Sequence, residues 1–191
     1  LTLADTEAHK IICESLSKLT PSIPILSEES SHIDFSERSR WSQYWLVDPL
    51  DGTREFIKKN GEFTVNIALV DGNKPILGVV YVPVSETSYI ATINYGAHKS
   101  VKENDLKKIS VRKADINNIT VAGSRSHGND KQKTFISNIK NADILSIGSS
   151  QKFCLIAEGR ADVYPRFGPT SEWDTAAAQC IVEESGGCVV D

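Results

Sequence analysis

Residues 63–82 read FTVNIALVDGNKPILGVVYV and form the clearest structural signal in the chain. Two apolar runs, residues 63–70 and 76–82, lie on either side of the polar triplet Asp71-Gly72-Asn73. A turn of this composition between two β-rich runs is typical of a hairpin, so the pattern predicts two antiparallel strands. We expect residues 88–93 to continue them as a third strand of an antiparallel meander.

Helical and strand-like segments alternate on both sides of this hairpin. The spacing of apolar residues predicts helices at 5–19, 131–139, 151–158 and 175–184, and short strands at 23–26, 45–47, 119–122, 144–147 and 161–164. Hairpins with interleaved helices favour layered α+β architecture over a doubly wound parallel sheet. A soft boundary near residues 100–118 predicts two lobes, an α+β lobe at 1–110 and an α/β lobe at 111–191.

The composition excludes several classes of protein. With 191 residues, 40% hydrophobic and 24% charged, the chain is neither disordered nor fibrous. Its net charge of −4 argues against a nucleic-acid polymer as partner, and it has no apolar run of the roughly 18 residues that a membrane helix needs. We expect the four cysteines, at 13, 154, 180 and 188, to be reduced core thiols of a cytoplasmic protein. Because the chain has no Met, we also expect it to be a fragment.

Two carboxylates follow the apolar run that ends at Val47. In Asp48-Pro-Leu-Asp51-Gly-Thr53 they stand three residues apart, where a strand breaks into a turn. Such a turn can direct both carboxylates and a backbone carbonyl at one point, which is the oxygen shell that Mg²⁺ prefers. An ordinary Asp-Pro and Asp-Gly turn is the alternative that the residues alone leave open.

Two further acidic segments have the same ambiguity. Glu28-Glu29 follows a short predicted strand and is either a metal site or a solvated loop, while Asp174 is either a ligand or the N-cap of the last helix. Three acidic segment ends that converged would repel one another and would need bound cations to stay ionised together. This favours a site for two or three Mg²⁺ ions.

Several motifs in the expected order resemble the inositol monophosphatase superfamily of Mg²⁺-dependent, lithium-sensitive phosphatases. Asp48-Pro-Leu-Asp51-Gly-Thr53 and Trp173-Asp174 are similar to its two signature motifs. NGEFTVNIA at 60–68, GSSQKF at 148–153 and YPRFGP at 164–169 resemble the 3'(2'),5'-bisphosphate nucleotidases of the CysQ type. The resemblance implies a layered αβαβα sandwich with largely antiparallel sheets, truncated here at both ends.

The resemblance also implies roles for individual residues. It implies that Mg²⁺ is held by Glu28, Asp48, Asp51, Asp174 and the Leu50 carbonyl, and that the attacking water is oriented and deprotonated by Asp5 and Thr53. It implies that substrate contacts come from Glu28, Leu50, Asp51, Gly52, Thr53, His127, Ser149, Lys152, Arg166 and Asp174. Without the resemblance, Asp5 is expected to cap a helix and Lys152 to be a solvent-exposed helix residue. Arg166, a lone charge among apolar and Pro residues, is expected to need a partner.

The implied reaction removes the 3'-phosphate of adenosine 3',5'-bisphosphate to give AMP and phosphate, and extends to 3'-phosphoadenylyl sulfate in sulfur assimilation. An inositol or sugar monophosphatase is one alternative, and a catalytically silent nucleotide-binding sensor is another. The intact set of acids argues against the sensor. The implied location is the cytoplasm, with peripheral association to the inner membrane as a variant in bacteria; the oligomeric state is left open.

Overall fold

The larger of two sheets contains the predicted hairpin. The computed structural model describes residues 1–30, 32–124 and 130–190. Seven strands pair in chain order: β1 (Ile25–Ser27), β2 (Gln43–Asp51), β3 (Thr64–Asp71), β4 (Lys74–Val82), β5 (Thr87–Thr92), β6 (Gly96–Val101) and β7 (Lys107–Ile109). β1 and β2 are parallel and every other neighbouring pair is antiparallel, which confirms the largely antiparallel prediction for this sheet.

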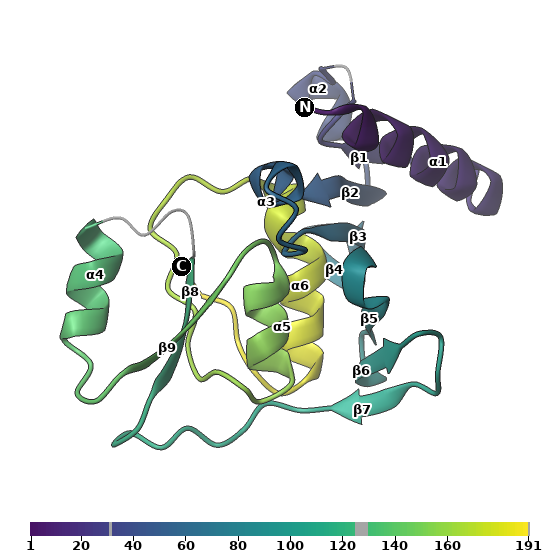
Figure 1. The fold of residues 1–191 in the computed structure, drawn as a ribbon. Coiled ribbons are helices and arrows are strands. Elements are labelled where there is room, and N and C mark those ends of the chain that lie inside the picture. The colour runs from purple at the N-terminus through teal and green to yellow at the C-terminus, as the bar shows by residue number, and fades with distance from the viewer. Residues whose placement is uncertain (31, 125–129, 191) are drawn as a thin grey trace.

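Helices and a second sheet complete five layers (Figure 1). Helix α1 (Leu3–Leu19) covers one face of the large sheet, and α5 (Gln151–Ala157) and α6 (Glu172–Glu184) cover the other. Beyond them lie the parallel strands β8 (Thr120–Ser124) and β9 (Asp143–Ile147), and then α4 (Asp130–Ser137). The short helices α2 (Phe35–Arg38), α3 (Thr53–Ile57) and η1 (Pro83–Ser85) lie in connections between strands of the large sheet. The predicted αβαβα sandwich is confirmed.

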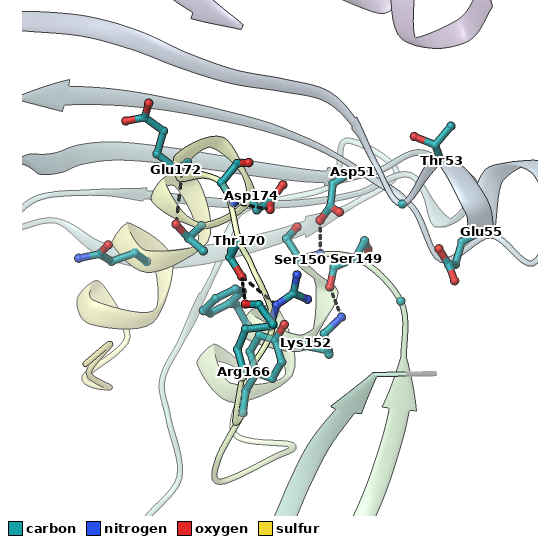
Figure 2. A pocket seen from close by; sticks show the side chains of 18 of the residues that line it. Asp51, Thr53, Glu55, Ser149, Ser150, Lys152, Arg166, Thr170, Glu172 and Asp174 are labelled. Atoms are coloured by element: carbon teal, nitrogen blue, oxygen red, sulfur yellow. Dashed lines mark hydrogen bonds between the residues drawn. The ribbon is translucent and has the colours of Figure 1, made fainter. Parts of the chain in front are cut away.

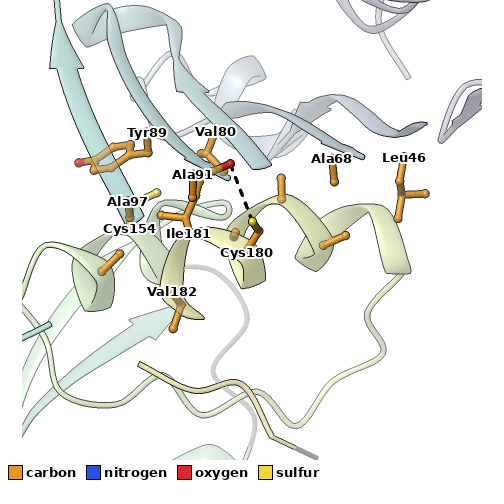
Figure 3. Close-up of a cluster of buried hydrophobic side chains, with 14 of the residues drawn as sticks. Leu46, Ala68, Val80, Tyr89, Ala91, Ala97, Cys154, Cys180, Ile181 and Val182 are labelled. Atoms are coloured by element: carbon orange, nitrogen blue, oxygen red, sulfur yellow. Dashed lines mark hydrogen bonds between the residues drawn. The ribbon is translucent and has the colours of Figure 1, made fainter. Parts of the chain in front are cut away.

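The main core lies between the large sheet and α6. Figure 3 shows Leu46 and Val80 on the face of the sheet that packs against α6, which contributes Cys180 and Ile181. The two layers touch at Gly78 of β4, where a Cβ atom would lie 2.2 Å from the carbonyl oxygen of Ala177. Only glycine fits such an approach, so residue 78 sets the distance between helix and sheet.

The opposite face of the large sheet packs on α1. Leu16 of the helix is buried with Trp45 and Val47 of β2, and Ile67 and Leu69 of β3 join them. Because β3 is covered on both faces, apolar side chains occupy both sets of its alternating positions. This explains why residues 63–70 read as a nearly continuous apolar run.

Some sequence predictions need correction. The predicted strand at 161–164 is reduced to one parallel bridge between Val163 and Val121, because Pro165 has no N–H for a longer ladder. β6 and β7 were not predicted. All four cysteines are free, but Cys188 is exposed and is therefore not a core thiol. The division into lobes at 1–110 and 111–191 stays a prediction. Among the described helices, none has the length and apolar character needed to span a bilayer.

Candidate active site

The end of β2 places two carboxylates at one corner. The register between β2 and β3 shifts between Asp48 and Asp51, and the Leu50 N–H donates to Asp48 Oδ1 at 3.0 Å. The Asp48 carboxylate therefore stabilises the turn that follows it. Gly52 follows with φ of +94°, a left-handed conformation that favours glycine, and Thr53 is the first residue of α3.

Asp174 joins this corner from α6. One ligand atom from each of Asp48, Asp51 and Asp174 lies within 4.8 Å of the other two. Figure 2 shows Asp51 and Asp174 along the same side of the pocket. Asp174 is more than 100 residues from Asp48 and Asp51 in the sequence, about the length of a small domain. The cluster therefore forms only because α6 packs against the sheet.

The helix that carries Asp174 begins earlier than predicted. Ser171 is the N-cap and Asp174 occupies the third helical position, where its Oδ2 accepts a hydrogen bond from the Ser171 N–H at 2.9 Å. The two residues form a capping box, in which each satisfies a backbone donor of the other. The prediction of Asp174 as N-cap of a helix from residue 175 is therefore wrong, although Asp174 does stabilise the helix start.

Burial and mutual repulsion raise the pKa values of the inner carboxyls. The Asp48 side chain is 1% exposed. Desolvation, together with the charges of Asp51, Glu28 and Asp174, raises the pKa of Asp48 to about 10. The pKa of Asp51 rises to about 6, chiefly by desolvation, while the positive charge of Lys152 works in the opposite direction. Without additional positive charge nearby, Asp48 and Asp51 are therefore not both ionised at neutral pH.

Glu28 adds a fourth acid from the end of β1. Its backbone N–H donates to the Val47 carbonyl at 3.0 Å, which fixes it beside β2. Desolvation raises the pKa of its carboxyl; a hydrogen bond with Asp48 acts against this, and the charges of Asp174 and Asp51 add to the increase. The structure therefore brings together the four acids that the sequence singled out.

Asp5 and Thr53 form a separate contact beside this cluster. Thr53 Oγ1 donates to Asp5 Oδ1 at 3.3 Å, while the backbone N–H and Oγ1 of Thr2 donate to Asp5 Oδ2 at 2.6 and 2.5 Å. Burial acts to raise the pKa of Asp5, but these hydrogen bonds outweigh it and leave the pKa below its ordinary value. Asp5 is thus held ionised as an acceptor, and it caps α1 as well.

Backbone hydrogen bonds connect the segment 148–152 to Glu62 and to Asp51 at the end of β2. The Gly148 N–H donates to Glu62 Oε2 at 2.9 Å, and the Ser150 N–H donates to Asp51 Oδ2 at 2.5 Å. Between them, Ser149 has φ of +52°. A Cβ at Gly148 would lie 2.7 Å from the Glu62 carbonyl oxygen, so this close approach also requires glycine.

Lys152 and Arg166 are placed differently from what their sequence surroundings suggest. Lys152 is 3% exposed rather than solvent-facing, and its Nζ donates to the Ser149 carbonyl at 2.6 Å. Desolvation lowers its pKa to about 8. Arg166 is exposed, and its partners are Thr170 Oγ1 at 2.8 Å and the Pro169 carbonyl at 3.1 Å. Its partners are thus neutral groups of its own loop.

These groups line one cavity of about 1020 Å³. Figure 2 shows Lys152 and Arg166 extending into it from the side opposite Asp51 and Asp174. Asp51 and Asp174 therefore lie across the cavity from Lys152 and Arg166, and Glu55 lies beside the segment that carries Lys152. The cavity is lined by Asp51, Gly52, Thr53, Glu55, Gly148, Ser149, Ser150, Lys152, Tyr164, Arg166, Asp174 and other residues. Tyr164 stacks edge-on against Phe153, and Phe167 lies against Phe135.

Sequence reasoning missed several residues of the site, and one residue that it predicted there lies outside the described part of the chain. Glu55, 4% exposed, and Glu62 border the segment 148–152, and Asn66 and Ser150 are buried beneath Asp51. A polar residue inside the apolar run 63–70 was the available signal for Asn66. The predicted substrate contact His127 lies outside the described residues.

The donor set fits a divalent cation. Asp48, Asp51 and Asp174 offer three carboxylate oxygens at close range. Burial, together with repulsion among the acids, raises the pKa values of Asp48 and Asp51, so a bound cation would favour their ionised forms. Hard cations such as Mg²⁺ or Ca²⁺ take oxygen ligands of this kind. The acids therefore form a candidate metal centre beside a cationic pocket.

Comparison with known proteins places this geometry in context. The family model described as the inositol monophosphatase family matches residues 1–191. The "3'(2'),5'-bisphosphate nucleotidase CysQ" of Salmonella typhimurium is 49% identical over 191 residues, which are 100% of this chain and 76% of that protein. The protein of the same name in Buchnera aphidicola is 50% identical over 189 residues, 99% of this chain and 70% of that protein.

Solved structures agree with the sequence comparison. CysQ from Bacteroides thetaiotaomicron, described as a bacterial member of the inositol monophosphatase family, superposes with a TM-score of 0.88 at 42% identity and covers 97% of this chain and 73% of its own. SuhB of Mycobacterium tuberculosis superposes with a TM-score of 0.80 at 27% identity, covering 95% of this chain and 72% of its own. The five-layer arrangement is thus shared well beyond the nucleotidases.

Proposed function

The chain belongs to the inositol monophosphatase family, and from this membership we propose that it is a 3'(2'),5'-bisphosphate nucleotidase. The proposed reaction hydrolyses the 3'-phosphate of adenosine 3',5'-bisphosphate to AMP and inorganic phosphate, and 3'-phosphoadenylyl sulfate is a second proposed substrate. Relatives with that name match across the whole chain at 48–50% identity. The free cysteines agree with a reducing, cytoplasmic place of action.

One observation carries this proposal: the two walls of the cavity have opposite charge. Asp51 and Asp174 lie on one wall and Lys152 and Arg166 on the other, within a single space. A ligand with a single phosphate needs only the proposed metal centre to bind its charge. A second cationic wall is required when the ligand carries a second phosphate, as a nucleoside bisphosphate does.

For the metal centre we propose two or three Mg²⁺ ions. Asp48, Asp51 and Asp174 would hold them together with Glu28, and the Leu50 carbonyl at the β2 turn would be a further ligand. When bound, the ions supply the positive charge that activates a water molecule and stabilises the charge on the phosphate and leaving oxygen. Asp48 and Asp51, whose pKa values are raised in the metal-free fold, would then both be ionised at neutral pH.

For water activation we propose Thr53 and Asp5. The Thr53 hydroxyl proton is already donated to Asp5 Oδ1, so its oxygen is left to accept a hydrogen bond from a water molecule. The proton of that water would move toward Thr53 as the Thr53 proton moves toward Asp5. The low pKa of Asp5 keeps this acceptor ionised over the working pH range.

For the far phosphate we propose Ser149, Lys152 and Arg166, with His127 at the nucleotide and Gly52 at the reacting phosphate. The Arg166 side chain is exposed, and its hydrogen-bond partners, Thr170 Oγ1 and the Pro169 carbonyl, are neutral groups. Its guanidinium can therefore exchange those contacts for a phosphate. Lys152 adds charge at the base of the cavity through an ammonium group held by the Ser149 carbonyl.

A phosphate-release assay tests the function. We expect Mg²⁺-dependent release from adenosine 3',5'-bisphosphate, inhibition by lithium, and much slower release from inositol 1-phosphate. Equal or faster release from inositol 1-phosphate would instead favour a monophosphatase. Tight nucleotide binding in calorimetry without any turnover would favour a silent sensor.

A single variant tests the bisphosphate pocket. Arg166→Ala should raise KM for the bisphosphate about tenfold or more, because a charge-assisted contact to phosphate is lost, and should leave turnover of a simple phosphate monoester unchanged. Arg160→Ala is the matched control, because Arg160 pairs with Glu158 away from the cavity. Equal losses on both substrates would show that Arg166 does not hold the second phosphate.

A further inference from the structure

Three buried polar side chains form a chain of hydrogen bonds beneath the metal-site corner. Thr64 and Asn66 of β3 are 0% and 1% exposed, and Ser150, just before α5, is 2% exposed. Thr64 Oγ1 lies 2.9 Å from Ser150 Oγ, and Ser150 Oγ donates to Asn66 Oδ1 at 2.8 Å. The function proposed above assigns no role to any of the three.

The direction of this chain follows from the number of protons. A serine hydroxyl has one proton, and Ser150 donates it to Asn66 Oδ1. Thr64 must therefore donate its own proton to Ser150 Oγ. With Oδ1 fixed as the acceptor, the amide of Asn66 has one defined orientation, and Nδ2 is its remaining polar atom.

Nδ2 of Asn66 is buried, and no described residue accepts a hydrogen bond from it. The same side chain nevertheless lies close enough to Asp51 to stabilise its ionised form. A buried donor without a partner is unfavourable, and in native proteins it calls for a specific explanation. Asp51 is an acid whose ionised form this side chain stabilises, and Asp48 is the cross-strand partner of Asn66.

The strand register places Asn66 and Thr64 beside the two acids at the end of β2. Asn66 is paired with Asp48, and Thr64 with Asp51, across β2 and β3. Ser150 contacts the same corner twice, because its backbone N–H donates to Asp51 and its hydroxyl bonds to Asn66. Ser150 is also the neighbour of Ser149, which belongs to the proposed phosphate-binding segment.

We propose that Thr64, Ser150 and Asn66 are positioning residues that couple metal binding to binding of the far phosphate. The chain of hydrogen bonds fixes the amide of Asn66 beneath Asp51 and fastens the segment 148–152 to the same point. Ordering of Asp51 by a metal ion therefore orders the segment that receives the nucleotide, and the reverse holds by reciprocity. This inference rests on the proposed function, because it takes a nucleotide phosphate as the second ligand.

Two substitutions of Thr64 separate hydrogen bonding from packing. Thr64→Val keeps the shape and removes the hydroxyl, whereas Thr64→Ser keeps the hydroxyl and removes a methyl group. Calorimetric titration with Mg²⁺, without and with AMP, measures the metal affinity and its enhancement by the nucleotide. We expect the wild type to bind Mg²⁺ about fivefold or more tightly when AMP is present.

The expected result is a contrast between the two variants. Thr64→Val should bind Mg²⁺ about five- to tenfold more weakly and should lose most of the enhancement by AMP, while Thr64→Ser should retain both. In a Ser150→Ala background, Thr64→Val should have little further effect, because the chain is already broken. Thermal unfolding of each variant shows that the fold is kept.

Several outcomes would overturn the proposal. It fails if Thr64→Val binds Mg²⁺ with the affinity and AMP enhancement of the wild type, if Thr64→Ser loses as much as Thr64→Val, or if the wild type shows no enhancement. Hydrolysis is not part of this measurement. A wild type that shows the coupling but releases no phosphate from the bisphosphate would therefore refute the proposed function and leave the positioning role standing.

Discussion

Helices α1 and α6 begin with the same local arrangement and use it for different purposes. In each, a hydroxyl residue is the N-cap and an aspartate is the third helical residue: Thr2 with Asp5, and Ser171 with Asp174. In each, the aspartate accepts a hydrogen bond from the N-cap N–H, at 2.6 and 2.9 Å. As capping boxes, the two sites are nearly interchangeable.

The difference lies in what surrounds the second carboxylate oxygen. Asp5 meets the hydroxyl of Thr53, so donors surround it and its pKa falls below the ordinary value. Asp174 meets Asp48 and Asp51, and its negative charge raises the pKa of both. The comparison shows that the tertiary neighbours, rather than the helix start, determine whether such an acid is stabilised by donors or repels other carboxylates.

Asp174→Asn should give the largest effect. The amide keeps an acceptor for the Ser171 N–H but removes a negative charge from the metal centre. Bisphosphate turnover should fall about 1,000-fold, since metal-assisted charge stabilisation is worth several kcal/mol. Mg²⁺ should also raise the melting temperature much less than in the wild type. Glu172→Gln is the control, because this exposed neighbour pairs with Arg38; a similar loss there would point to a disturbed helix start.

Asp5→Asn should reduce turnover by about 100-fold, in the range expected for loss of a proton acceptor. Its distinctive result is in metal binding, because Asp5 is held by Thr2 and Thr53 and is not one of the three converging carboxylates. Calorimetry should therefore give a Mg²⁺ affinity close to that of the wild type. A large loss of affinity would move Asp5 into the metal centre and remove the contrast with Asp174.

The two sites should also differ in how pH affects stability. Asp48 and Asp51 have folded-state pKa values of about 10 and about 6, above the ordinary 3.8, so the metal-free fold binds protons more strongly than the unfolded chain and loses stability as pH rises through that window. The pKa of Asp5 is lowered, so its contribution is present above its unfolded pKa and is lost only as pH falls through the folded value.

A thermal scan at two pH values measures this difference. In EDTA the melting temperature should drop by roughly 5 °C between pH 5.5 and pH 8, since 1 kcal/mol corresponds to about 2–4 °C at this size. Mg²⁺ should restore stability more at pH 8, because its ligands must be deprotonated. A melting temperature that rises with pH in EDTA would contradict the raised pKa values.

The smallest effect is expected from the caps themselves. Thr2→Ala and Ser171→Ala should each destabilise the fold by about 1 kcal/mol in urea unfolding. Thr2 also donates its hydroxyl to Asp5 at 2.5 Å, so Thr2→Ala should additionally slow turnover, whereas Ser171→Ala should affect mainly stability. Equal effects on turnover would show that the two helix starts serve the site in the same way.

The sequence predicted the elements whose signal is local and missed those that depend on packing. The hairpin of β3 and β4 was read correctly, because its apolar runs and Asp-Gly turn are contiguous. β6 was missed, because its sequence Gly-Ala-His-Lys-Ser-Val carries few apolar residues and is held by β5 on one side and β7 on the other. The start of α6 was predicted too late, at residue 175. The true N-cap is Ser171, which precedes the apolar Trp173 in the sequence.

For the site, the acids were found but several of their surroundings were not. Motif spacing identified Asp48, Asp51 and Asp174, which the structure brings together. No local pattern could show that Lys152 is buried, because the acids around it, Asp51, Glu55 and Glu62, come from a distant part of the chain. For Arg166 the sequence predicted that a partner is needed, and the structure shows that its partners are neutral groups of its own loop.

The contact of α6 with Gly78 also determines when in folding the cluster of Asp48, Asp51 and Asp174 is completed. Asp174 reaches the β2 corner only after the helix has settled onto the sheet, because Ala177 sits one turn further along and touches β4. Before α6 packs, the chain therefore holds Asp48 and Asp51 at the end of β2 without Asp174, and we expect this incomplete set to bind divalent ions more weakly. If the acids bind Mg²⁺ as proposed, the Mg²⁺ affinity would report whether α6 is packed on the sheet, and it should fall before the strands unfold when α6 loosens.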